Sequence, residues 1–248
     1  MRNRPRFAAL AASTLLTAPA LSVGAVAQAD ASPTIEEIVV TARGRTETVQ
    51  SVPISETVFS ASLIQDAGID RVDDFFAMTP GVTFANSQDA GTNFISIRGS
   101  TQSRNTAPPV AIVIDGVLLT NERMFDQPLF DLSSIEVLRG PQGALYGRNA
   151  IGGAIIINTK GPTNEFEGYA QATAGNGDSF GGELSVSGAI VPDVLKARVS
   201  AHYFNRDGFF HNPVIDERMD YQENIAFRGH LEFTPAPWLQ MDLRGSLV

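Results

Sequence analysis

The sequence lacks cysteine altogether, and it contains only three histidines and one tryptophan among 248 residues. Without cysteine the chain forms no disulfide, binds no metal through thiolates and has no thiol nucleophile. The histidines, His202, His211 and His230, lie in different segments without the spacing of a metal site. We therefore expect no resident metal, and stability must come from packing or from a membrane.

Positive charge is also scarce, because 18 lysines and arginines stand against 27 aspartates and glutamates, for a formal net charge of −9. No segment gathers basic residues into a patch. A nucleic-acid partner requires such a patch to neutralise phosphates, so this class of function is excluded.

Nucleotide and catalytic motifs are missing as well. The glycine-rich run from Gly140 to Gly147 is not followed by Gly-Lys-Ser/Thr, and Gly175-Asn176-Gly177 lacks the third glycine of a dinucleotide fingerprint. The sequence shows no catalytic constellation. We predict a protein that is not an enzyme and holds no cofactor.

The first 29 residues have the parts of a secretory signal peptide. Three arginines within the first six residues precede a mostly apolar stretch over 7–26, and Ala25-Val26-Ala27 and Ala27-Gln28-Ala29 both fit the cleavage pattern. A retained membrane helix is the alternative, which Pro19 and Gly24 disfavour. We predict export after cleavage at Ala27 or Ala29.

Long apolar runs are absent beyond residue 29. The strongest, Val110–Leu119, is interrupted by Asp115 and Gly116. A spanning helix needs about 20 apolar residues, so any insertion of the mature chain into a membrane has to use strands.

The segment Glu36-Glu37-Ile38-Val39-Val40-Thr41-Ala42 is typical of a short strand outside a packed domain. Its Ile, Val and Thr favour extended backbone, and Pro33 and Gly44 separate it from neighbouring elements. The sheet edge of another protein can capture such a strand through main-chain hydrogen bonds. We therefore predict a partner-binding strand within an N-terminal extension over residues 30–49, with an ordinary edge strand as the alternative.

Residues 50–162 alternate short strands, short helices and glycine turns, as expected of one α+β domain with its own core. Ser62 and Gln65 fit a capping box for a first helix, and Asp70 fits the cap of a second. Asp115-Gly116 suits a two-residue hairpin turn with positive φ. Strands are expected at residues 55–59, 82–84, 94–98, 110–114, 117–119, 135–138 and 154–158.

Residues 163–248 change to a strict alternation of apolar and polar side chains. In one segment, Arg198, Ser200 and His202 share a face opposite to alanine, valine and tyrosine. Each of about five such segments has the length of a tilted transmembrane β-strand, and short turns alternate with a longer joint over 205–222. A soluble β-sandwich is the alternative. The polar face suits a watery lumen, and the apolar face suits lipid.

An ordered series of motifs follows the strand at 36–42. It comprises Ile97–Gly99, Val137–Gly143, Leu145–Asn149 and Gly152–Lys160. Together with the signal peptide, this series closely resembles the TonB-dependent outer-membrane receptors over essentially the whole mature chain. A series of this length is far more specific than a single short motif.

The resemblance implies a plug domain inside an antiparallel barrel of about 22 strands, in the outer membrane of a Gram-negative bacterium. Residues 36–42 would be the TonB box, on which the inner-membrane partner TonB pulls, with Ile38, Val39 and Val40 as the expected contacts. The implied function is energy-coupled import of a scarce nutrient. A ferric siderophore is the most frequent substrate of the family, and carbohydrates, haem and cobalamin are the alternatives.

The resemblance also implies roles for particular residues. Arg98 and Arg139 are expected to lock the plug to barrel glutamates, with surface arginines in turns as the alternative. Polar loops over 86–93 and 101–109 are expected to face the substrate unless they are ordinary polar loops. The candidates there are Asn86, Gln88, Asn93, Gln102, Arg104 and Asn105. The motif glycines, Gly99, Gly140, Gly143, Gly147, Gly152 and Gly153, are expected to permit turns and close approach.

The number of predicted strands indicates how much of a receptor this chain contains. Five strands cannot close a barrel of about 22, and an open sheet leaves backbone groups unsatisfied in lipid. We therefore expect a signal peptide (1–29), a plug (50–162) and the first strands (163–248) of a larger receptor. The alternative is a non-transporting plug that acts only as a periplasmic TonB-binding module. A signalling receptor is disfavoured, because residues 30–35 leave no room for an extra domain.

Overall fold

The structure is a computed structural model that describes residues 39–40, 47–48, 55–86, 93–102, 106, 108–120, 125, 127–147, 149–214 and 216–248. The predicted signal peptide lies outside this range. All described residues belong to one unit, Glu37–Val248.

A five-stranded mixed sheet organises the first half of the described chain. Its order is β3-β8-β9-β6-β7, with β6 and β9 parallel and the other pairs antiparallel. The buried runs of β8 and β9 are nearly continuous in Val, Ile and Leu, as expected of strands covered on both faces. The strands are β3 (Ser55–Ser60), β6 (Val110–Ile114), β7 (Val117–Leu118), β8 (Leu132–Arg139) and β9 (Gly153–Thr159).

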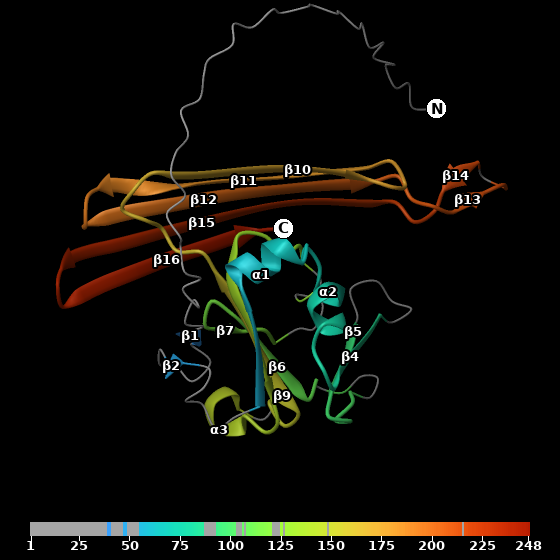
Figure 1. Cartoon of the computed structure of the whole chain (residues 1–248), viewed down its shortest axis with the longest axis horizontal. Helices are drawn as coiled ribbons and strands as arrows, with labels where there is room; N and C mark the ends of the chain where they lie inside the picture. Colours follow the sequence, from blue (N-terminus) through green and yellow to red (C-terminus); the bar gives the residue numbers. More distant parts are fainter. Residues whose placement is uncertain are drawn as a thin grey trace, which may run out of the picture. The chain divides into compact units, whose positions relative to one another are not determined.

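The two faces of this sheet carry separate apolar clusters. The larger cluster joins the sheet to α1 (Ala61–Asp66), α2 (Val72–Ala77) and the hairpin of β4 (Val82–Asn86) and β5 (Asn93–Ile97). The smaller cluster lies on the opposite face, where Tyr146 of α3 (Gly143–Tyr146) packs against it. Figure 1 shows α1 and α2 in cyan and teal and the sheet strands in blue to yellow-green. The predicted α+β domain is therefore present.

The helix starts differ from the predicted ones. Ser60, not Ser62, caps α1, because its side-chain oxygen accepts the Leu63 N–H at 3.3 Å. In α2 the cap is Arg71, not Asp70, and the Asp74 carboxylate accepts the backbone N–H of Arg71 at 2.9 Å. The acidic residue acts from inside the first turn of α2, where the helix dipole also favours negative charge.

The predicted hairpin at Asp115-Gly116 is confirmed. Strands β6 and β7 pair antiparallel across it, with φ of 49° at Asp115 and 82° at Gly116. Positive φ at both central residues defines the turn type that suits this dipeptide.

A second, longer antiparallel sheet forms the C-terminal half, in the order β10-β11-β12-β15-β16. Figure 1 shows its strands running side by side, from gold to red. The strands are β10 (Glu167–Gly175), β11 (Ser179–Val191), β12 (Leu195–Arg206), β15 (Gln222–Ala236) and β16 (Leu239–Leu247). They match the five predicted segments, and among the described residues the sheet stays open.

Burial in this long sheet is inverted relative to a soluble protein. Polar Ser185, Ser200 and Arg198 are 2%, 2% and 5% exposed, whereas Val199 and Phe227 are 60% and 51% exposed. A sandwich buries its apolar face, so the alternation belongs to a sheet whose apolar side faces a non-aqueous surrounding. The antiparallel membrane-type strands that we predicted are thus present.

Two small hairpins complete the described elements. β1 (Val39–Val40) pairs with β2 (Glu47–Thr48), and β13 (His211–Asn212) pairs with β14 (Glu217–Arg218) in the predicted long joint. In the described part of the chain, no helix has the length and apolar character needed to cross a membrane.

Candidate functional site

The long sheet is attached to the first domain chiefly through Asp131, the residue before β8. Asp131 adopts a left-handed backbone with φ of 53° and is 6% exposed. Its carboxylate accepts hydrogen bonds from Arg198 Nε at 2.8 Å and from the Ser200 hydroxyl. Its backbone N–H donates to Glu183 Oε1 at 3.0 Å, and its carbonyl accepts the Lys160 N–H at 2.9 Å. One residue thus connects three segments of the chain.

The ionisation of Asp131 depends on this cluster. Burial alone would raise the pKa of its carboxyl, but the hydrogen bonds from Arg198 and Ser200 and the charge of Arg198 outweigh burial and lower it. Asp131 is therefore held as a carboxylate. A buried Arg–Asp pair with further hydrogen bonds on the same oxygens is well compensated, and loss of either partner is costly.

Phe130 extends the same attachment. Its carbonyl accepts Arg228 Nη1 at 2.6 Å, and its ring lies under the Arg228 guanidinium at 4.3 Å. The ring also stacks on His202, at 5.5 Å between centroids. Phe130 and Asp131 together are called the anchor below.

A second attachment involves the hairpin turn at Asp115. Its two carboxylate oxygens accept the Thr159 N–H and hydroxyl, each at 2.9 Å, and Arg244 Nη1 of β16 lies 2.9 Å from Oδ1. Arg244 Nε lies 3.3 Å from His230 Nε2, which is 2.9 Å from Asp242 Oδ1. Because the β6–β7 turn positions Asp115, it also positions the ion pair between Asp115 and Arg244 of the long sheet.

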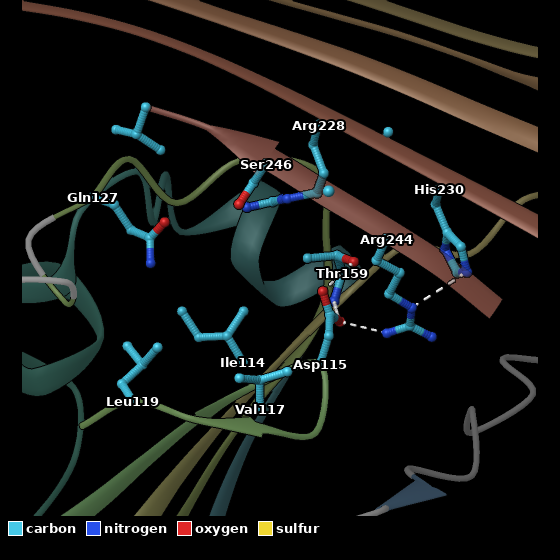
Figure 2. Close-up of a pocket in the computed structure, with 13 residues that line it drawn as sticks. Ile114, Asp115, Val117, Leu119, Gln127, Thr159, Arg228, His230, Arg244 and Ser246 are labelled. Atoms are coloured by element: carbon cyan, nitrogen blue, oxygen red, sulfur yellow. Dashed lines mark hydrogen bonds and ion pairs between the residues drawn. The ribbon is translucent and has the colours of Figure 1, made fainter. Parts of the chain in front are cut away.

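A cavity of about 480 Å³ lies beside this second attachment. Ile114, Val117 and Leu119 supply apolar walls, and Arg228 and His230 line it from β15. Figure 2 shows Arg244 extending toward Asp115 and Thr159, with His230 beyond it. The cavity separates the β6–β7 hairpin from β15 and β16, so it belongs to the contact between the two sheets.

The connecting segment between the two sheets is also fixed. The Thr163 N–H donates to the Ser187 hydroxyl at 2.8 Å, and the Asp193 N–H donates to Asn164 Oδ1 at 3.0 Å. The C-terminal end of the first domain is therefore held by β11 and by the turn that precedes β12.

The two predicted lock arginines lie together, at the Pro80-Gly81 turn. Arg139 Nη1 donates to the Pro80 carbonyl at 3.0 Å, and the Arg98 N–H donates to the Gly81 carbonyl at 3.0 Å. Arg98 is exposed. In the described chain, Phe130, Asp131, Asp115 and the segment around Thr163 contact the long sheet instead. Pairing of Arg98 and Arg139 with barrel glutamates stays a prediction.

The six motif glycines have different structural reasons. Three of them need positive φ: Gly99 at 79°, Gly140 at 115° and Gly147 at 78°. A Cβ on Gly153 would lie 2.2 Å from the Leu138 carbonyl oxygen, and one on Gly152 would lie 3.1 Å from Ser100 Cβ. Gly143 meets no atom within 4 Å and has no positive φ. Close approach and turn formation thus account for five of the six.

The predicted loop and box residues are only partly described. Gln88, Arg104, Asn105 and the side chain of Asn86 lie outside the described residues, and Gln102 Nε2 donates to the Thr106 carbonyl at 3.1 Å. Asn93 begins β5 and is 4% exposed, so it is not a loop residue. Its backbone pairs with Asn86 in the β4–β5 ladder.

Of the predicted box, the structure describes the backbone of Val39 and Val40. They are extended, as predicted, but they pair with Thr48 and Glu47 of the same chain and so are not an unpaired strand. Glu36, Glu37, Ile38, Thr41 and Ala42 lie outside the described residues.

The anchor was not predicted from the sequence. The sequence places Arg198, Ser200 and His202 on one polar face. Asp131, which Arg198 and Ser200 contact, lies 67 and 69 positions away from them in the sequence. An aspartate directly before a long apolar strand was the available signal. The described residues contain no group of three His, Cys, Asp or Glu side chains that could hold a metal ion.

Comparisons with known proteins agree with this architecture. Residues 48–154 match the family model of the TonB-dependent Receptor Plug Domain. The chain is 35% identical over 202 residues to the pesticin receptor of Yersinia pestis, covering 80% of this chain and 29% of that protein. It is 28% identical over 194 residues to the ferripyoverdine receptor of Pseudomonas aeruginosa, covering 77% of this chain and 22% of that receptor.

Solved structures give the same result. The ferric yersiniabactin uptake receptor from Yersinia pestis superimposes with a TM-score of 0.73 at 31% identity, over 78% of this chain and 31% of that one. The outer-membrane ferripyoverdine receptor of Pseudomonas aeruginosa superimposes with a TM-score of 0.69 at 25% identity, over 84% and 27%. The chain spans about 29% of the length of the first curated relatives that it matches.

The fold and the attachments define a plug domain bound to the inner, polar face of membrane-type β-strands. With these matches, the chain belongs to the TonB-dependent receptors. The predicted outer-membrane localisation in a Gram-negative bacterium is thereby confirmed, and the relatives are receptors and not enzymes.

Proposed function

We propose that this chain supplies the plug and the first barrel strands of an importer for a ferric siderophore, powered by TonB through residues 36–42. The observation that carries the proposal is the inverted long sheet, whose polar face is paired to the plug through Asp131 and Arg198. Two of the matched receptors are named for ferric chelates, ferric yersiniabactin and ferripyoverdine. This supports a chelate of the same class as substrate.

The positions of these attachments also support an order in which the parts of the plug leave the barrel. Within the described chain, hydrogen bonds and ion pairs to the long sheet come from Asp115, the anchor and the segment after β9. The first plug strand, β3, pairs with β8 only, in the described sheet. Tension applied at the N-terminus reaches β3 first, while the anchored part stays with the barrel.

Uptake of radioactive iron tests the proposal. The complete receptor gene is expressed in cells that lack their own siderophore receptors, and ferric yersiniabactin and ferripyoverdine are the probes. We expect uptake of a ferric chelate that disappears when TonB is deleted. Ile38→Pro removes a strand N–H and is expected to abolish uptake, whereas Thr46→Pro, outside the box, is the matched control.

Three results would overturn the proposal. They are the absence of uptake of any ferric chelate, uptake that persists without TonB, and equal loss in the Ile38→Pro and Thr46→Pro variants.

A further inference from the structure

Arg228 of β15 is a cation that binds no carboxylate of the described chain. Its Nη1 donates to the Phe130 carbonyl at 2.6 Å, and its guanidinium lies over the Phe130 ring at 4.3 Å. Within the described residues it forms no ion pair, and its Nε and Nη2 donate to no other group. These two nitrogens form the edge through which a guanidinium binds a carboxylate with two parallel hydrogen bonds. Arg198 binds Asp131 through the same edge.

The carboxylates that act electrostatically on Arg228 are bound by other groups. They are Asp115, Asp131 and Glu183. Each of them already accepts an ion pair or a hydrogen bond from another residue. Arg228 therefore keeps the capacity to bind one more anion. Because protein covers one side of its guanidinium, the attraction for an anion is stronger than it would be in bulk water.

Arg228 lines the cavity of about 480 Å³ beside Asp115. Figure 2 shows Arg228 on one side of this cavity and the apolar side chains of Ile114, Val117 and Leu119 on the other. His230 also lines it, and its buried Nδ1 has no hydrogen-bond partner in the described chain. Cavities of about 300–1,000 Å³ are typical of sites for small organic ligands. A cationic side opposite an apolar side suits an organic acid better than an inorganic ion.

This cavity is separate from the loop over 101–109 that we predicted to face the substrate. The two lie at opposite ends of β9. Before its first residue, a Cβ on Gly152 would lie 3.1 Å from Ser100 Cβ, whereas Thr159, its last residue, binds Asp115 beside the cavity. On the long sheet, Arg228 lies in the middle of β15 and not in the joint over 205–222.

We propose that this cavity is a second ligand site, which takes an organic carboxylate. Arg228 holds the carboxylate through Nε and Nη2, and the apolar side chains of the β6–β7 hairpin pack against the body of the molecule. The carboxylate belongs either to an imported chelate that passes along the barrel wall or to a free organic acid. The first source rests on the proposed function, whereas the binding itself does not.

Fluorine NMR of 4-fluorobenzoate tests the site on the whole receptor in lipid nanodiscs, without TonB or a ferric chelate. The probe has one carboxylate and one apolar ring, 4-fluorobenzamide is its neutral counterpart, and empty nanodiscs report partition into lipid. We expect saturable binding of the benzoate, about tenfold or more tighter than binding of the benzamide, because the amide lacks the charge that strengthens both hydrogen bonds.

Two pairs of variants locate the binding. Val117→Trp fills the cavity from the hairpin, and Leu118→Trp is its control, since adjacent residues of a strand point to opposite sides and Leu118 does not line the cavity. Arg228→Gln removes the charge, and Arg218→Gln, in the exposed β13–β14 hairpin, is its control. Val117→Trp and Arg228→Gln are each expected to weaken binding by about tenfold or more. The two controls are expected to retain it.

Val117→Trp decides if Arg228→Gln does not fold, because Val117 is 65% exposed and has room for a larger side chain. The site is overturned by binding no greater than to empty nanodiscs, by equal binding of the benzamide, or by unchanged binding in Val117→Trp.

A competition experiment identifies the source of the carboxylate. Displacement of 4-fluorobenzoate by the chelate that the uptake assay shows to be imported assigns the site to that chelate, and retention of the probe assigns it to a free organic acid. Loss of iron uptake alone overturns the proposed function and leaves binding of 4-fluorobenzoate unchanged.

Discussion

At the scale of single residues, Asp131 holds the plug on the barrel strands. Its carboxylate is shared by Arg198 and Ser200, and Arg198 is only 5% exposed. Removal of the arginine leaves a buried carboxylate without its countercharge, which is more costly than loss of an exposed ion pair. The strength of attachment is therefore concentrated in one side chain of β12.

We predict that Arg198→Gln lowers the free energy of unfolding by about 3–5 kcal/mol. Lys196→Gln is the matched control, because Lys196 lies on the same strand and pairs with Glu232 at a more exposed site. Its cost is expected to be about 1 kcal/mol or less. Urea unfolding in lipid, followed by tryptophan fluorescence, measures both. Equal costs for the two variants would contradict the central role of Asp131.

The same residue predicts an acid sensitivity. Since the folded pKa of Asp131 is lowered, its contribution to stability is present above the unfolded pKa of 3.8 and is lost as the pH falls through the folded value. We expect plug attachment, measured as resistance to limited proteolysis with an acid protease, to weaken in this acid range. Asp131→Asn is expected to be weaker at neutral pH and to lose this part of the pH dependence.

At the scale of elements, the pairing of β8 with β9 depends on a missing side chain. A Cβ on Gly153 would lie 2.2 Å from the Leu138 carbonyl oxygen and 2.9 Å from Ile97 Cδ1. The backbone at Leu138 cannot move away from such a contact without breaking the hydrogen bonds between β8 and β9. Gly143 has open space and sits in α3, where alanine is the better helix former.

We therefore predict opposite signs for two substitutions within one glycine-rich motif. Gly153→Ala is expected to lower the free energy of unfolding by about 3 kcal/mol, as in other overpacked sites. Gly143→Ala is expected to be neutral or to raise it by about 0.5 kcal/mol. Thermal unfolding of the reconstituted protein measures both. A tolerated Gly153→Ala would show that β8 and β9 can separate at this point.

The elements also show what sequence patterns can predict. The five membrane-type strands were found because a period of two residues assigns each side chain to a face, as with Val199 and Ser200. The Asp115-Gly116 turn was found because few dipeptides suit positive φ at both positions. The anchor was missed, since contacts of Asp131 with Glu183, Arg198 and Ser200 span 52 to 69 residues and depend on packing.

Helix caps illustrate a nearer limit of sequence patterns. Ser60 and Ser62 both precede apolar residues, and their hydroxyls lie 2.9 Å apart. The pattern for a capping box favours Ser62, but β3 ends at Ser60, and the chain turns into α1 at that residue. Where a helix begins is thus decided by the preceding strand, which local propensity does not include.

At the scale of the whole molecule, the plug is held unequally at its two ends. Its C-terminal part is attached through Asp115, the anchor and the segment around Thr163. Its N-terminal strand β3 is joined to the described sheet by β8 alone. Under the proposed function, a pull from the N-terminus would separate β3 from β8 before it loads the ion pairs, and import would then require β3 to leave the sheet.

A disulfide across β3 and β8 tests this requirement, and these 248 residues contain no cysteine that could compete for the new bond. Thr57 and Val137 are partners in register, so Thr57→Cys with Val137→Cys is expected to block iron uptake until a reductant is added. The matched control joins two barrel strands through Leu231→Cys with Leu243→Cys, which are also partners in register and should leave uptake unchanged. Uptake that persists with the β3–β8 bond fully formed would show that the plug opens elsewhere, and β3 would then be a fixed part of it.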